Sequence, residues 1–280
     1  MGQAEIRLAG ERWCGQPHRR WLYGTQVSIA EGAPPEAQGF PAAQRPRAWR
    51  WLVASSALVL ALVAGVLTAW WAATRETRTS TYDVLGDLAG ITLDLQDADV
   101  QIDGGSAAVE VRKVDRFAFG RPSTERRSVR DGVLTLVSRC PDQVLGGCRT
   151  SYRLTVPDNV PVTVRTSSGA VRLSGVRASV MVNTGSGAID ATGFCGHSLA
   201  AVSDSGTVSA AAECAVEQIT LRSRTGDVHA IVPAGERYRV DAESDSGTSR
   251  VRGVTDAEDA LFQVQALSTS GDVSVDGGPA

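Results

Sequence analysis

One short sequence pattern recurs six times between residues 160 and 275, and it constrains the fold more than any other feature of the chain. In each copy a glycine is preceded by Ser or Thr at one and at three residues, and by an apolar residue at seven. Successive glycines are 18, 19, 20, 21 and 24 residues apart. A repeat of this length is typical of proteins built from stacked structural units. The six glycines are Gly169, Gly187, Gly206, Gly226, Gly247 and Gly271.

Each copy has the pattern of two short strands that meet at the glycine. In the first copy, Val162 and Val164 alternate with polar residues before the corner, and Val171 and Leu173 alternate after it on the opposite parity. This alternation indicates half-buried strands, and glycine tolerates the positive φ that a sharp corner requires. One copy has too few apolar residues for a core of its own, so the copies must stack. The sequence therefore predicts an all-β fold, a single-stack β-solenoid or β-roll with repeats of about 20 residues.

Two further features of the repeat region follow from this stacking. The Ser or Thr three residues before each glycine should point inward, where its hydroxyl needs a hydrogen-bond partner. Residues 91–102 (ITLDLQDADVQI) match the repeat with Ala98 in place of the glycine. We therefore predict that they form a first, divergent rung that caps the stack.

The β domain is expected to span residues 88–276, followed by a tail at residues 277–280. Within it, residues 104–159 leave the 20-residue period and are predicted as irregular strands and loops. Strand candidates in that stretch are residues 109–111, 133–137 and 152–156.

A 23-residue segment without charge, Trp51–Ala73, precedes the β domain. As a helix it would be about 35 Å long, enough to cross a hydrocarbon layer of about 30 Å. Tryptophans bracket it at both ends, as in the aromatic belts of membrane-spanning helices. The length and uniform apolarity argue against a buried core helix, and 50 residues before the segment argue against a cleaved signal peptide. We predict one transmembrane helix, residues 51–73, with a belt made of Trp49, Trp51, Trp70 and Trp71.

The cysteines and the flanking charges predict the orientation of this helix. Cys14 precedes the segment, whereas four cysteines follow it. An even set of cysteines after the span is expected where that part of the chain faces an oxidising space. Arg45, Arg47 and Arg50 before the span add a weak positive-inside bias. The expected topology is a cytoplasmic N-terminus and an extracytoplasmic C-terminal domain in the cell membrane.

Two disulfides are predicted among the four later cysteines. Cys195 and Cys214 are 19 residues apart, close to one repeat, which would place them on neighbouring rungs at a distance that a disulfide accepts. Two buried thiols are the alternative. Cys140 and Cys148 flank a turn-rich segment that a disulfide would close.

The segments beside the helix carry few signals. Residues 1–50 are short, basic and rich in proline near the helix, and we predict a largely disordered cytoplasmic segment. Residues 74–87 are predicted as a polar spacer. Cys14 and His18 lack the further ligands of a zinc site, and Asp94, Asp97, Asp99 and Asp103 lack a calcium-binding pattern. No metal or cofactor is therefore predicted.

An arginine-rich stretch lies between residues 112 and 130. It is either an ordinary solvated loop or a basic patch for phosphate-bearing envelope polymers or lipid headgroups. The formal net charge of the whole chain is −3, which indicates no nucleic-acid partner. The basic residues of the stretch include Lys113, Arg116, Arg121, Arg126, Arg127 and Arg130.

The chain lacks the sequence signatures of the common enzyme classes. It has three histidines and none of the usual hydrolase, metalloprotease or nucleotide-binding motifs. The outward position three residues after each glycine includes one carboxylate, Asp190, whereas glycoside hydrolysis needs a pair. We predict no catalytic residues.

The repeated Ser/Thr-x-Ser/Thr-Gly-x-Val pattern, ITLDLQDADVQI and YRLTVPDNVPVTVRTSSGAVRLSGV together resemble the bacterial putative adhesin domain family. The resemblance covers about residues 88–276. It implies a repetitive β domain of unassigned biochemical role at the cell envelope, without catalytic residues to carry over.

The sequence as a whole favours a membrane-anchored, extracytoplasmic binding or structural module that meets an envelope polymer or a surface protein. The alternative is a transmembrane sensor or regulator that acts on a cytoplasmic partner through residues 1–50. A solenoid carbohydrate-active enzyme is less favoured, and the sequence assigns no oligomeric state.

Overall fold

The computed structural model describes residues 47–118, 121–141 and 148–278. Within these ranges it has one helix, α1 (Arg47–Ala73), followed by strands. The segment Trp51–Ala73 of α1 has a mean hydropathy of 2.3 and is long and apolar enough to cross a membrane. Trp51, Trp70 and Trp71 are exposed, whereas the Trp49 side chain and residues Cys14 and His18 lie outside what the structure describes.

The β domain consists of nineteen strands in the described residues. The first six precede the repeats: β1 (Arg75–Val84), β2 (Gly90–Gly104), β3 (Val109–Ala118), β4 (Thr124–Arg130), β5 (Val133–Arg139) and β6 (Arg149–Val156). The next eight form the first four repeats: β7 (Val162–Ser168), β8 (Val171–Ser174), β9 (Val180–Ser186), β10 (Ile189–Phe194), β11 (Ser198–Ser205), β12 (Val208–Ala212), β13 (Gln218–Thr225) and β14 (Val228–Pro233). The last five are β15 (Arg237–Ser244), β16 (Ser249–Arg252), β17 (Thr255–Asp256), β18 (Phe262–Ser270) and β19 (Val273–Gly278).

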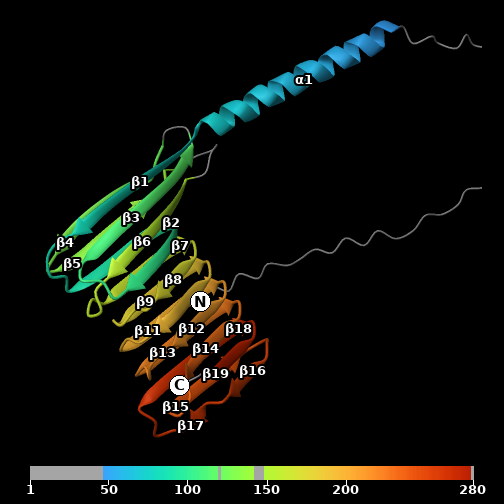
Figure 1. Ribbon diagram of the computed structural model, residues 1–280. Helices are drawn as coiled ribbons and strands as arrows, with labels where there is room; N and C mark the ends of the chain where they lie inside the picture. Colours follow the sequence, from blue (N-terminus) through green and yellow to red (C-terminus); the bar gives the residue numbers. More distant parts are fainter. Residues whose placement is uncertain (1–46, 119–120, 142–147, 279–280) are drawn as a thin grey trace, which may run out of the picture. The chain divides into compact units, whose positions relative to one another are not determined.

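The strands stack as two ladders, because each repeat contributes one strand before its corner and one after it (Figure 1). We call the ladder of the strands after the corner ladder A and the ladder of the strands before it ladder B. The long strand β2 takes part in both. In space, ladder A runs β1, β3, β6, β2, β8, β10, β12, β14, β19, β16. Ladder B runs β4, β5, β2, β7, β9, β11, β13, β18, β15, β17.

The predicted apolar columns form the core between the ladders. In ladder B, Val162, Val180, Leu199 and Ile219 are register partners in successive strands, and all are buried. In ladder A, the residues two positions after the glycines, from Val171 to Val228, are also register partners in successive strands, and all are buried. The prediction of an all-β solenoid-like fold is confirmed.

The order of the last two repeats in space is not their order in the sequence. Strand β13 pairs with β18, and β18 pairs with β15; likewise β14 pairs with β19, and β19 with β16. The sixth repeat therefore lies between the fourth and the fifth, which forms the end of the stack. The two repeats differ two residues after the glycine, where the fifth has the exposed Ser249 and the sixth has the buried Val273, so the sixth suits the interior of the stack better.

The start of the β domain shows the same kind of insertion. Strand β2 lies between β5 and β7 in ladder B and between β6 and β8 in ladder A. Residues 91–102 are therefore an internal rung, not the predicted cap. The prediction that residues 104–159 are irregular is also wrong for the strands described there, since β5 and β6 continue the parallel register and β3 and β4 add antiparallel strands outside them. The predicted polar spacer at residues 74–87 is wrong as well, because β1 lies in it and pairs with β3.

The corners join the rungs through one recurrent set of hydrogen bonds. The inward hydroxyls donate to the carbonyl oxygen of the corner glycine one rung away: Ser203 to Gly187 at 3.1 Å, Ser223 to Gly206 at 2.9 Å, Ser268 to Gly226 at 2.9 Å and Ser244 to Gly271 at 2.7 Å. Five of the six glycines have positive φ, and at Gly206 (φ +149°) a Cβ would lie 2.3 Å from the Gly187 oxygen. Gly247, in the outermost rung, is the exception.

Candidate functional site

Three arginines from three strands meet on the outer surface of ladder A. Arg112 of β3 is the register partner of Arg153 of β6, which is paired with Gln101 of β2, and Gln101 is paired with Arg172 of β8. The strands are about 4.8 Å apart, so the arginine Cα atoms span about 14 Å. The alternation of the strands turns these side chains away from the core, because Val111, Leu154 and Leu173 beside them are buried.

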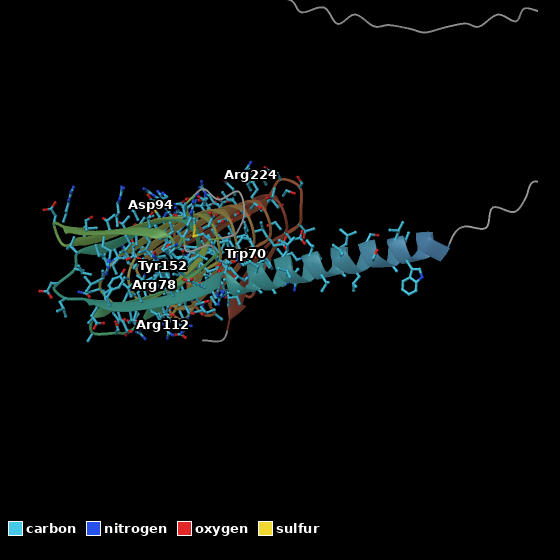
Figure 2. The ribbon with its side chains drawn as sticks, turned by 90° about the horizontal axis from the view of Figure 1, so that it is seen from above. Trp70, Arg78, Asp94, Arg112, Tyr152 and Arg224 are labelled. Carbon is cyan, nitrogen blue, oxygen red and sulfur yellow. A yellow bond between two sulfur atoms is a disulfide. The ribbon has the colours of Figure 1, made fainter. Side chains whose placement is uncertain are left out.

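These arginines line a groove of about 390 Å³ on ladder A, which we call the arginine groove. Arg153 donates from Nη2 to Oε1 of Gln101 at 2.8 Å, and Gln101 in turn donates from Nε2 to the carboxylate of Asp103. These bonds hold one guanidinium over the groove. The other lining residues are Asp99, Val100, Val114, Ser151 and Tyr152. Figure 2 shows Arg112 on one outer surface of the domain and Asp94 on the opposite one.

The chemistry of the groove suits an anionic group. A guanidinium is always charged and presents planar donors that match carboxylate, phosphate and sulfate oxygens. Three of them on one surface, with the Ser151 hydroxyl at the next outward position of β6 before Arg153, offer several donors to an extended anion. Asp99 on the groove wall would favour a ligand that also carries a donor, such as a hydroxyl.

The arginine-rich stretch between residues 112 and 130 does not form the continuous basic patch that its sequence allows. Lys113 points into the domain and is buried. Arg116 lies on ladder A, whereas Arg126 and Arg130 lie on β4 of ladder B. Alternation of side chains along strands separates residues that are neighbours in the sequence.

Lys113 belongs to a buried group of charges at the end of the stack, the N-terminal charge cluster: Lys113, Asp115, Glu125, Tyr82 and Tyr152. Nζ of Lys113 lies 3.0 Å from Oδ2 of Asp115 and 3.4 Å from Oε2 of Glu125. The hydroxyls of Tyr82 and Tyr152 each donate to Glu125 at 2.9 Å. The cluster connects the two ladders where the apolar core ends, and Figure 2 shows Tyr152 between them.

The charged groups of this cluster are all paired or hydrogen-bonded, as is typical of a cluster that stabilises the fold. Asp115 also accepts hydrogen bonds from Ser123 at 2.7 Å and from Thr150 at 3.0 Å. Burial, and next the negative charge of Glu125, raise the pKa of Tyr82 far above its usual range. Burial likewise raises the pKa of Tyr152. Both phenols therefore remain neutral donors to Glu125, and each charged side chain of the cluster has an opposite charge beside it.

One histidine lies beside a serine and a carboxylate on the outside of ladder A. His229 Nδ1 is 2.5 Å from Oγ of Ser274 and 3.7 Å from Oδ2 of Asp276. A catalytic triad needs the nucleophile and the carboxylate on opposite ring nitrogens. Here both face the same nitrogen, so the histidine cannot pass a proton from the serine while the aspartate orients it.

Both predicted cysteine pairs are close together. Cys195 and Cys214 have Cα atoms 5.2 Å apart, and Cys140 and Cys148 have Cα atoms 5.8 Å apart, each with its sulfurs bonded. Cys195 follows β10 and Cys214 follows β12, which are parallel neighbours. Among the described residues there is no group of three His, Cys, Asp or Glu side chains that could hold a metal ion.

The arginine groove was missed from the sequence because its residues come from distant segments. Arg112, Arg153 and Arg172 become neighbours only through the insertion of β2 between β6 and β8. The available signal was parity: Arg153 and Arg172 each stand between two inward residues with apolar or aromatic side chains, whereas Arg112 stands between Val111 and the buried Lys113. The positions of the three arginines in the sequence do not show that their strands lie in the same part of the sheet.

The fold agrees with a family match. The family model Toastrack DUF4097 matches residues 158–275, a range that excludes β1 to β6. No curated protein matches the chain.

Several solved structures are similar to the chain. A putative cell adhesion protein from Clostridium sporogenes is 12% identical, with 72% of this chain and 100% of that chain covered and a TM-score of 0.48. A putative adhesin from Bacteroides fragilis is 12% identical (72% and 97% covered, TM-score 0.33). A third, from Parabacteroides merdae, is 10% identical (71% and 96% covered, TM-score 0.36). The repeat, the two ladders and the family match agree over residues 158–275, where the chain is similar to the Toastrack DUF4097 family.

Proposed function

We propose that the protein is a membrane-anchored binding module of the cell envelope, whose β domain binds an anionic partner on the extracytoplasmic side through the arginine groove. The observation that carries this proposal is the meeting of Arg112, Arg153 and Arg172, from three separate strands, on one outer surface. Arginine side chains of like charge repel one another, and an anion between them would relieve that repulsion. A phosphate-bearing envelope polymer has the required charge and length.

The anchor and its orientation rest on the chain around α1. The uncharged segment Trp51–Ala73 has the length of a membrane span. The two bonded cysteine pairs lie after it, and disulfides persist in oxidising compartments. We infer that residues after 76 lie outside the cytoplasmic membrane and act by binding rather than by catalysis.

The binding test compares two triple variants of the full chain in detergent micelles, with immobilised polyphosphate as the probe and neutral dextran as its control. Arg112→Ser, Arg153→Ser and Arg172→Ser together should weaken polyphosphate binding about tenfold or more, since each removes a charge-assisted donor. Arg165→Ser, Arg222→Ser and Arg224→Ser remove the same charge from ladder B and should leave binding nearly unchanged. If both variants lost the same binding affinity, polyphosphate would bind to the positive charge of the domain in general and not to the arginine groove. Absence of binding by the native chain would refute the proposal.

The orientation has its own test. Protease added to intact, wall-stripped cells should degrade the chain after residue 76 and spare the N-terminal segment. Protection of the C-terminal part would reject the topology, whatever the outcome of the binding test.

A further inference from the structure

The far end of the stack, formed by β15 and β16, has two open strand edges. Strand β15 pairs with β18 on one side, and on its other side β17 covers Arg237 and Tyr238. Asp256 also accepts a hydrogen bond from the backbone N–H of Val240. From Asp241 onward β15 has no neighbour on that side among the described strands, and β16 pairs with β19 alone.

Near the corner, the inward side chains of this last rung are only partly covered, whereas Tyr238 further along β15 is buried. Val251 of β16 is 45% exposed, whereas Val275, its register partner one rung further in, is fully buried. Ala242 of β15 is partly exposed next to the fully buried Ala266. The core therefore continues to the surface at this end, and open edges with apolar side chains beside them are templates for strand pairing.

The outward side chains on the two open edges have opposite charges. Strand β15 carries Asp241 and Glu243, and strand β16 carries Arg250 and Arg252. None of these four forms an ion pair within the described ranges, although Asp241 accepts a hydrogen bond from Gln265. The open stretches also have equal lengths, four residues each: 241–244 and 249–252.

We propose that this end of the stack binds a second copy of the chain, tail to tail, about a twofold axis through the corner at Gly247. Such an axis places β16 of one copy antiparallel to β15 of the other, and the reverse. Antiparallel partners that lie opposite each other point to the same side of a sheet. One register satisfies this for both edges at once.

That register places Arg250 opposite the partner's Glu243 and Arg252 opposite the partner's Asp241. On the inner side, Val251 meets the partner's Ala242, and Ser249 meets the partner's Ser244. The twofold axis repeats each contact, so both copies use the same surface and the assembly closes as a dimer. A shift of one residue would place charged residues opposite inward ones, so the pairing is specific.

The test uses the full chain in detergent micelles and measures its mass by light scattering. The native chain should form dimers. The variant Asp241→Arg with Glu243→Arg should be monomeric, and so should Arg250→Glu with Arg252→Glu, because each faces like charges across both edges. Mixing the two variants should restore the dimer, since a mixed pair has opposite charges at both edges.

A matched control reverses two exposed carboxylates away from this end, Asp204→Arg with Glu217→Arg, and should leave the dimer intact. Recovery in the mixture also shows that both reversed variants are folded. A native chain that stays monomeric contradicts the proposal. So does a dimer that survives both reversals, which would be held elsewhere, for example by α1, or a mixture that does not recover.

Discussion

The two ends of the β stack are finished in opposite ways. At the start, β1, β3 and β4 add antiparallel strands, and the N-terminal charge cluster replaces the apolar core between the ladders. At the far end, the last rung ends in open edges with Val251 exposed, and β17 covers two residues of one of them. We call the first end closed because buried polar contacts join its two ladders, although Val129 on its edge strand β4 is 54% exposed, and we call the far end open because its last rung exposes Val251.

The charged side chains on the outermost strands also differ between the two ends of the stack. At the closed end both edge strands carry arginines: Arg75 and Arg78 on β1, and Arg126 and Arg130 on β4. Charged side chains on an edge strand are one way in which proteins protect sheet edges, and β1 also carries Glu76 and Asp83. At the open end one edge is acidic and the other basic, so the difference selects which end can associate.

The largest expected effect tests the closed end. Lys113→Met keeps the length of the side chain but leaves Asp115 without its cation and Glu125 with Arg127 alone (Nε to Oε1 3.1 Å), in a site where the lysine and Asp115 side chains are 7% and 8% exposed. Breaking a buried ion pair by removing one partner costs about 3–5 kcal/mol. Denaturant unfolding should report a loss of this size in the free energy of unfolding.

The matched change at the open end is Arg252→Met, which removes an exposed cation and should cost less than about 0.5 kcal/mol in the monomer. Similar small losses for both variants would mean that the charge cluster does not hold the two ladders together.

Most of the repeat could be predicted from its sequence because local rules determine it. Alternation specified the strands, the glycines marked the corners, and the Ser/Thr position three residues earlier identified the inward hydroxyls that bond to the neighbouring rung. The length and apolarity of Trp51–Ala73 identified the helix in the same way.

The order of the rungs could not be predicted, because stacking depends on which strands pair over long distances. Val240 and Val264 have the same size and parity, so ladder B alone does not decide which repeat follows Ile219; the structure pairs Ile219 with Val264. The sequence does differ at Ser249 of the fifth repeat, which stands where the sixth has Val273. The arginine groove and the open edges depend on that order. The inward position of Lys113, by contrast, was accessible, since it alternates with Val109, Val111 and Phe117 in one strand.

A second prediction compares the middle of the stack with its open end. Gly206→Ala places a Cβ at φ +149° and 2.3 Å from the Gly187 oxygen, with rungs on both sides. It should destabilise by at least about 2 kcal/mol. Gly247→Ala also brings its Cβ close to a backbone oxygen, that of Gly271 at 2.2 Å, but without positive φ.

The rung of Gly247 has a neighbour on one side only, so it can shift, and we expect a loss nearer 1 kcal/mol. Thermal and denaturant unfolding of both variants measure the difference. Equal losses would show that the last rung is held as firmly as the middle ones.

The smallest expected effects concern single hydroxyls at the corners. Ser203→Ala removes the hydrogen bond to the Gly187 oxygen in the middle of the stack and should cost about 1 kcal/mol. Ser244→Ala removes the equivalent bond to Gly271 in the last rung, where water can replace it, and should cost about half as much or less.

Thr184 has a buried hydroxyl without a hydrogen-bond partner in the part of the chain that the structure describes. Thr184→Val replaces that hydroxyl by a methyl group of similar shape, so stability should stay the same or rise by up to about 1 kcal/mol. The three variants therefore rank in the order Ser203→Ala, Ser244→Ala, Thr184→Val from most to least destabilised in denaturant unfolding. If Thr184→Val lowered the free energy of unfolding as much as Ser203→Ala does, the Thr184 hydroxyl would also be hydrogen-bonded in solution. The difference in stability between the middle and the end of the stack would then come from strand pairing and not from the corner hydroxyls.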